Sequence, residues 1–206
     1  MFLYYAPNAC SLVVHIALEE AAATYELIRV DFANKGQRAP EFLAKNPLGR
    51  VPVLETEHGL LTEVPAILTY ISLAYPDAKL GTFDPYMAAR LASFQAFLSS
   101  TVHVTFAHYF RPERWADDEC ARKAISLKAV NTYAQNFRMI EEHWFVGPWV
   151  MGDHFTTADP YLYLMARWLS RIGLSVSSFP RIEQHLRQMS ARPSVIRTLK
   201  QEELEQ

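Results

Sequence analysis

The sequence predicts an α/β domain followed by an all-helical domain. Strand-like and helix-like segments alternate over residues 1–76, whereas the periodic segments after residue 85 all have helical spacing. Residues 77–85 lose this periodicity and are rich in turn formers, which indicates a linker. We therefore expect a first domain over residues 1–76 and a helical second domain over residues 86–206.

The first domain begins with a strand, a turn and a helix. Residues 2–5 are strand formers, Pro7 and Asn8 end the strand, and apolar residues then repeat at helical spacing. A second strand over residues 24–32 leads through a polar loop into a short helix around residues 40–45.

A hairpin and a third helix complete the first domain. Residues 51–55 alternate like a strand, residues 60–62 return antiparallel, and residues 58–59 suit the tight turn between them. Pro65 stands where the first turn of a helix tolerates proline, and the apolar periodicity continues to Tyr75.

Acidic residues and prolines mark the helix starts of the second domain. Asp84 and Pro85 form a cap and first-turn pair that opens a long helix to about residue 110. Residues 156–159 have the S/T-x-x-D capping pattern, which predicts a helix start rather than a catalytic group. Further helices are expected from Asp117 or Asp118 to about residue 145, after Phe155, and at Pro180 and Pro193.

Charge and cysteine usage limit the classes of function. The 206 residues carry a formal net charge of −2 with scattered basic groups, which argues against a nucleic-acid partner and favours a small molecule. No stretch reaches the ~20 apolar residues that span a bilayer, and no secretion signal is evident, so we expect a cytoplasmic protein. Cys10 and Cys120 are far apart and fit no zinc-binding spacing, so we expect neither a disulfide nor a metal site.

Cys10 is the first candidate for chemistry because it lies at the start of the first expected helix. Unpaired backbone N–H groups and the helix dipole favour an anion there and lower the pKa of a thiol, which would make Cys10 reactive. The alternative is a small buried apolar residue. Ser11 offers a hydroxyl that can donate to a bound thiolate, or is simply a first-turn residue.

Two short segments suit an extended ligand. A cis peptide before Pro52 would turn the N–H and C=O groups of Val51 outward to pair with a peptide-like ligand; the alternative is an ordinary edge-strand proline. At the start of the helix that Pro65 opens, backbone N–H groups near Val64 suit a carboxylate and Glu63 suits an ammonium group, although an acidic residue there is also a common helix cap. A γ-glutamyl group carries both charges.

The second domain adds a histidine and a set of aromatic residues. His103 could supply a proton or a hydrogen bond to a thiol, although many helix histidines have no such role, and the spacing of the histidines excludes an H-E-x-x-H metal site. The aromatic residues suggest an apolar pocket or, alternatively, core packing: Phe106, Tyr109, Phe110, Trp115 and Trp168.

Segments from both domains, in this order and separation, resemble the bacterial beta-class glutathione S-transferases: YYAPNACSLVVHIALEE, NPLGRVPVL, LLTEVPAI and FTTADPYLYLMARW. The resemblance spans nearly the whole chain. It implies a thioredoxin-like first domain with a mixed four-stranded sheet, an all-α second domain and a homodimer. By this likeness Cys10 contacts the glutathione sulfur, Val51 and Pro52 hold the cysteinyl backbone, and Glu63 with the Val64 amide holds the γ-glutamyl end.

The resemblance also reaches three further positions. Lys35 and Arg50 lie where the family has polar or basic groups near the tripeptide. His103 falls at the histidine that the family places in its second domain, facing the cysteine.

The sequence departs from the family pattern at a few positions. Val64 stands where the family usually has glycine or serine, so it keeps the backbone donor but supplies no hydroxyl. Thr101 and Val104 stand where a glutamate and a lysine are common around the histidine, and Asn8 replaces a usual glycine before the cysteine. These departures bear on affinity for glutathione rather than on the fold.

The resemblance implies an enzyme of detoxification, a glutathione transferase that binds glutathione as co-substrate and directs its thiol at a hydrophobic electrophile or a disulfide. A cysteine beside the glutathione sulfur also permits a glutathione-dependent thiol-disulfide reductase, because the two sulfurs can form a mixed disulfide. A third alternative is a non-enzymatic protein that binds glutathione or another ligand.

Overall fold

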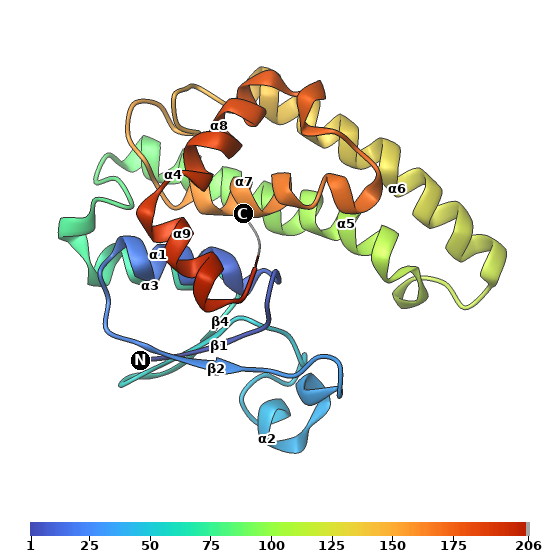
Figure 1. The fold of residues 1–206 in the computed structure, drawn as a ribbon, viewed down its shortest axis with the longest axis horizontal. Helices are drawn as coiled ribbons and strands as arrows, with labels where there is room; N and C mark the ends of the chain where they lie inside the picture. Colours follow the sequence, from blue (N-terminus) through green and yellow to red (C-terminus); the bar gives the residue numbers. More distant parts are fainter. Residues whose placement is uncertain (205–206) are drawn as a thin grey trace. The chain divides into compact units, whose positions relative to one another are not determined.

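The computed structural model describes residues 1–204 and divides them into two compact units (Figure 1). The first unit comprises Met1–Phe83 together with the residues from Met189 onward, and the second comprises residues 84–188. The expected combination of an α/β part and a helical part is confirmed.

A mixed four-stranded sheet lies at the centre of the first unit. β1 pairs in parallel with β2 and antiparallel with β3, and β3 pairs antiparallel with β4. Leu3 in β1 and its partner Leu54 in β3 are fully buried because these two strands occupy the middle of the sheet. The strands lie in the order β2 (Glu26–Arg29), β1 (Phe2–Tyr5), β3 (Val53–Thr56) and β4 (Gly59–Thr62).

Helix α1 (Ser11–Glu20) is surrounded by other elements of the first unit. It contacts β1, α3 (Val64–Ala74) and α9 (Pro193–Gln201), and every residue from Ser11 to Leu18 is buried. This explains why its apolar residues cover the whole circumference of the helix rather than one stripe. The short helix α2 (Pro40–Leu43) lies between β2 and β3 in the chain.

The end of the chain differs from the expected domain division. Residues 86–206 were predicted to form one helical domain, but α9 and the residues around it pack with the first unit. Val195 and Leu199 are buried, and α9 lies against α1 (Figure 1). An amphipathic pattern shows that a helix has an apolar face, but not which surface that face covers.

The second unit is helical throughout its regular segments. The predicted helix from Pro85 to about residue 110 appears as α4 (Pro85–Phe97), a wide π turn over Leu98–Val102, and α5 (His103–Phe110). Helix α6 (Glu119–Met139) likewise ends in a π turn, over Ile140–Trp144. The remaining long helices are α7 (Ala158–Arg167) and α8 (Pro180–Ser190).

The predicted helix caps are confirmed. The Asp84 carboxylate accepts a hydrogen bond from the backbone N–H of Met87, and the Asp118 carboxylate accepts one from Ala121, each at 2.8 Å. The carboxylate of Asp159 accepts from both the N–H and the hydroxyl of Thr156, which confirms the structural reading of the S/T-x-x-D pattern. Among residues 1–204, no helix is both long enough and apolar enough to span a membrane.

Candidate functional site

Cys10 occupies the turn between β1 and α1. It is the residue before the first residue of α1, and its side chain is half-buried. The turn is closed by a hydrogen bond of 3.1 Å from the N–H of Ala9 to the carbonyl of Ala6, and Asn8 adopts a left-handed backbone conformation with φ 56°. The structure therefore places Cys10 at the helix start that the sequence predicts.

The thiol of Cys10 points at the backbone of Val51. Its Sγ atom donates to the Val51 carbonyl oxygen at 2.9 Å, and the peptide bond between Val51 and Pro52 is cis. The cis form is the alternative that would suit a peptide-like ligand. Both residues precede β3 instead of beginning it, because β3 starts at Val53.

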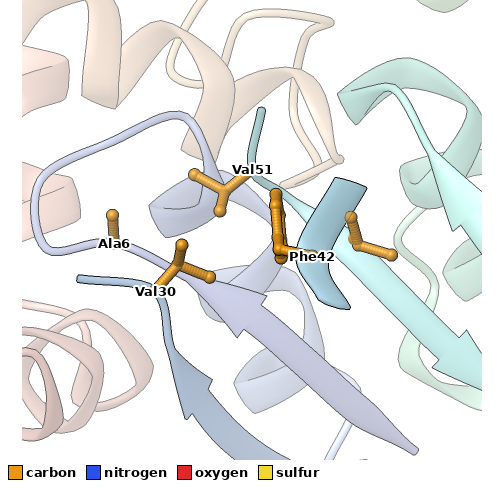
Figure 2. Close-up of a cluster of buried hydrophobic side chains, with 5 residues drawn as sticks. Ala6, Val30, Phe42 and Val51 are labelled. Atoms are coloured by element: carbon orange, nitrogen blue, oxygen red, sulfur yellow. The ribbon is translucent and has the colours of Figure 1, made fainter. Parts of the chain in front are cut away.

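A cluster of buried apolar residues anchors Val51. Figure 2 shows its side chain among those of Ala6, Val30 and Phe42, and Val53 completes the cluster. Because the side chain is held in the core, the position of the Val51 backbone beside Cys10 is set by packing.

The electrostatic surroundings of Cys10 reverse the expected shift of its thiol pKa. Burial raises this pKa to about 12, which outweighs the lowering by the backbone N–H groups of Cys10 and Ser11. Glu63 raises the pKa further and Arg50 lowers it. Of the two readings that the sequence left open, the raised pKa favours the partly buried thiol over a thiolate, because desolvation of the anion outweighs the backbone donors.

The contacts of Ser11 agree with the alternative reading of a first-turn residue, and its role toward a bound thiolate stays a prediction. The Ser11 side chain is fully buried, and its hydroxyl donates to the Ala6 carbonyl and accepts from the Ala6 N–H, each at 3.2 Å. A hydroxyl has a single hydrogen to donate, and here that hydrogen stabilises the turn. Ser11 thus supports the turn that positions Cys10.

Glu63 and Val64 lie where β4 passes into α3. Glu63 precedes the helix with an exposed side chain and an unusual backbone conformation, φ 68° and ψ 121°, and its side chain makes no capping hydrogen bond. Val64 is buried and begins the helix. An exposed carboxylate beside the free N–H groups of a helix start can bind an ammonium and a carboxylate group together.

Two further predicted positions are exposed in loops of the first unit. The Arg50 carbonyl accepts a hydrogen bond from the Asn46 side chain at 2.8 Å. The positive charge of Arg50 lowers the pKa of the Cys10 thiol. Lys35 begins a short 3-10 turn in a left-handed conformation. Val51 thus contacts the Cys10 thiol, and the charges of Arg50 and Glu63 shift the pKa of that thiol. Lys35 has no described contact with these residues.

His103 belongs to the second unit. Its ring lies 5.2 Å from that of Trp168, and Trp168 stacks on Phe106 at 4.2 Å. The guanidinium of Arg171 lies 4.7 Å from the ring centre of Phe110. Three of the predicted aromatic residues, Phe106, Phe110 and Trp168, thus share one cluster beside His103.

Sequence reasoning missed a buried polar pair that approaches the Cys10 turn. His15 in α1 and Glu202 after α9 are both fully buried and lie 2.9 Å apart. The available signal was a single histidine inside the apolar run LVVHIAL of a predicted helix. Among residues 1–204, no group of three or more metal-binding side chains is present.

Comparison with known proteins identifies the two parts of the chain. Residues 1–72 match the family model "Glutathione S-transferase, N-terminal domain" and residues 94–193 match "Glutathione S-transferase, C-terminal domain". The chain is 31% identical to glutathione S-transferase GstA of Escherichia coli O157:H7, over 95% of each sequence.

Solved structures extend this similarity to the fold. A glutathione transferase homologue from Sulfitobacter, solved with bound glutathione, has a TM-score of 0.94 and 39% identity, with 97% of each chain covered. A bacterial beta-class glutathione S-transferase from Sphingomonas chungbukensis has a TM-score of 0.87 and 34% identity over the full length of both chains.

Proposed function

The chain belongs to the glutathione S-transferase family, and on that premise we propose that it binds glutathione and activates the glutathione thiol for attack on a hydrophobic electrophile. In this reaction the glutathione thiol loses its proton to solvent, and the thiolate forms a bond to an electrophilic carbon. The leaving group, chloride in a chlorodinitrobenzene, departs with the electrons of its bond to that carbon. The protein must hold the tripeptide and stabilise the thiolate. No metal takes part in this proposal.

Glutathione lies extended along the segment that precedes β3. The N–H group of Val51 pairs with the cysteinyl backbone, and the cis Val51–Pro52 peptide shapes this edge for an extended ligand. Glu63 takes the ammonium group of the γ-glutamyl end, and the N–H of Val64 takes its carboxylate. Arg50 and Lys35 are the cations available to the other carboxylate. The glutathione bound to the Sulfitobacter homologue supports this ligand.

Cys10 acts as a hydrogen-bond donor to the glutathione thiolate. The observation that carries this role is the Cys10 thiol, which donates to the Val51 carbonyl at 2.9 Å, and burial raises the pKa of this thiol to about 12. On binding, the same S–H group turns from the carbonyl to the incoming sulfur. A thiol with this pKa is a poor nucleophile near neutral pH, which favours conjugation over thiol exchange.

His103 is the proposed contribution of the helical part. A histidine beside the aromatic residues Phe106 and Trp168 suits a proton donor or acceptor for a hydrophobic electrophile. Replacing His103 with Gln, which keeps a hydrogen-bonding side chain, separates a proton-transfer role from a hydrogen-bonding role through the pH profile of kcat.

Substitution of Cys10 tests the proposal. Conjugation of glutathione to a chlorodinitrobenzene and reduction of hydroxyethyl disulfide are measured for Cys10→Ser and Cys10→Ala, with Cys120→Ser as the matched control. Because a serine hydroxyl also donates, Cys10→Ser is expected to keep most of its conjugation activity, whereas Cys10→Ala loses it. Full loss in Cys10→Ser together with loss of disulfide reduction would instead identify Cys10 as the nucleophile of a reductase.

Binding without turnover is the remaining outcome. Retention of the protein on immobilised glutathione, with no reaction of either substrate, would support the non-enzymatic alternative. Failure to bind glutathione would contradict both the enzyme and the non-enzymatic binding protein.

A homodimer in the cytoplasm is part of the same proposal. Sedimentation of the purified chain checks the oligomeric state.

A further inference from the structure

A buried polar cluster joins the C-terminal end of α9 to the middle of α1. The imidazole of His15 lies with Nδ1 2.9 Å from Oε1 of Glu202 and with Nε2 2.6 Å from Oε1 of Gln201. The side chains of His15 and Glu202 are both fully buried. All of these residues belong to the first unit, which also contains Cys10.

His15 links Glu202 to Gln201. The side-chain nitrogen of Gln201 donates to Glu19 at 3.3 Å, and its oxygen faces His15. The two ring nitrogens of His15 thus contact one oxygen of Glu202 and one of Gln201, and these contacts hold the buried carboxylate in place.

The second oxygen of Glu202 reaches the turn before Cys10. Its Oε2 atom accepts from the backbone N–H of Asn8 at 3.1 Å. Asn8 has φ 56°, the left-handed conformation that glycine and asparagine adopt most readily. Cys10 follows two residues later, so a buried carboxylate holds the backbone of the turn that presents the thiol.

The surroundings strengthen these hydrogen bonds. The rings of Tyr5 and Tyr25 lie edge-on to His15, with centroids at 6.1 Å and 5.6 Å, and help to exclude water. Burial, followed by the charge of Glu202, raises the pKa of the Tyr5 hydroxyl, and Glu202 itself is fully buried. Hydrogen bonds to a charged group are strong in such a region, and an unpaired charge there is costly.

We propose that Glu202, held by its hydrogen bond with His15, is a positioning residue for Cys10. By binding the Asn8 amide it fixes the left-handed turn, and the fixed turn keeps the Cys10 thiol against the Val51 carbonyl. Without the carboxylate, the turn loosens and the thiol becomes accessible to solvent and reagents. The inference rests on the proposed role of Cys10, but its test measures the thiol in the absence of glutathione.

Two other ion pairs between the same segments provide the comparison that the test needs. Arg192 makes two hydrogen bonds to the carboxylate of Glu20, at 2.7 Å and 2.6 Å, and Arg197 makes one to Glu19 at 2.6 Å. Both pairs join the α9 region to Glu19 and Glu20, at the end of α1 opposite to the turn that contains Asn8. Removing one of these ion pairs therefore weakens the packing of α9 on α1 without removing the hydrogen bond between Glu202 and Asn8.

The test uses a Cys120→Ser background, in which Cys10 is the single thiol. Into it are introduced Glu202→Met, which removes the acceptor at similar length, Glu202→Gln, and the control Arg192→Met. Each variant is unfolded in urea to establish that it is folded, and the rate of Cys10 alkylation by iodoacetamide is measured under native conditions.

We expect Glu202→Met to raise the alkylation rate by about tenfold, the equivalent of one lost hydrogen bond. Glu202→Gln is expected to stay near the parent rate, because its carbonyl oxygen still accepts from Asn8 while its NH₂ group faces Nδ1 of His15. Arg192→Met is expected to lower stability and leave the rate unchanged. An unchanged rate in Glu202→Met, or an equal rise in Arg192→Met, would overturn the proposal.

A measurement on the unmodified protein covers the case in which Glu202→Met does not fold. Amide hydrogen exchange followed by NMR should show the Asn8 amide proton exchanging as slowly as the buried amides of α1. If it exchanges at the rate of an exposed loop amide, the carboxylate does not hold the turn, and the proposal is wrong.

Discussion

The Cys10 thiol and the Val51 carbonyl oxygen lie 2.9 Å apart, although 41 positions separate the two residues in the sequence. The contact joins the start of α1 to the segment that precedes β3. It shows Cys10 as a hydrogen-bond donor, and the neighbouring groups agree with that role because burial and Glu63 both disfavour the thiolate.

The pH dependence of Cys10 reactivity follows from this. Because burial raises the thiol pKa to about 12, the reactive thiolate is a minor species at neutral pH and grows about tenfold with each pH unit. In a Cys120→Ser variant, the rate of alkylation by iodoacetamide should therefore climb steadily, with no plateau up to about pH 10. A plateau between pH values of about 6 and 8 would contradict the raised pKa and restore a reactive thiolate.

Glu63→Gln tests the proposed ammonium site. The substitution removes the charge but preserves the shape of the exposed side chain, so the fold should be unchanged. Affinity for glutathione is expected to fall about tenfold to a hundredfold, the typical effect of losing a hydrogen bond to a charged group. Isothermal titration calorimetry measures it. Glu57→Gln, which makes the same charge change in the exposed β3–β4 turn, should bind glutathione normally.

Gly49→Ala tests the loop that leads to Arg50 and Val51. Gly49 has φ +61°, and a Cβ atom there would lie 2.6 Å from the carbonyl oxygen of Gln37. The positive φ alone costs roughly 1–2 kcal/mol, and the overlap is expected to add about 1–3 kcal/mol. Gly173→Ala is the matched control, since Gly173 has φ +77° with no atom within 4 Å of its Cβ position. Equal urea midpoints for the two variants would show that the loop moves away from the added Cβ atom at no cost in stability, and would contradict the prediction.

Asp159→Ala tests the buried cap of α7. Its carboxylate accepts from the backbone N–H groups of Val150 and Thr156 and lies 3.0 Å from Nε2 of His185. Removing a buried carboxylate that pairs with several donors is expected to lower the free energy of unfolding by about 3–5 kcal/mol. The exposed cap variant Asp118→Ala should lose only about 1 kcal/mol. Similar losses in urea denaturation would show that burial of Asp159 adds nothing.

Local signals in the sequence determined much of the fold. The alternation of strand and helix patterns, the caps at Asp84 and Asp118, and the prolines that begin α8 and α9 depend on contacts within a few residues. These features are encoded by propensity and hydrogen bonding along the chain, so they can be read without tertiary contacts. The family likeness further indicated which residues to consider for glutathione.

The direction in which the pKa of Cys10 shifts depends on tertiary structure. A helix start favours a thiolate, but burial of the thiol, which contacts the Val51 carbonyl, raises its pKa. Ser11 shows the same limit, because its hydroxyl is used by Ala6 in the turn. Burial depends on which distant segment arrives, and the local pattern does not contain that information.

The placement of the chain's end likewise came from packing. By its sequence α9 is an amphipathic helix like any other, and the structure adds it to the first unit, where Glu202 meets His15 and Asn8 across most of the chain length. The sequence by itself thus determined the kinds of elements, their order and the family. Tertiary packing decided which buried groups share a proton or a hydrogen bond, because those energies depend on distances between residues that the chain brings together only when folded.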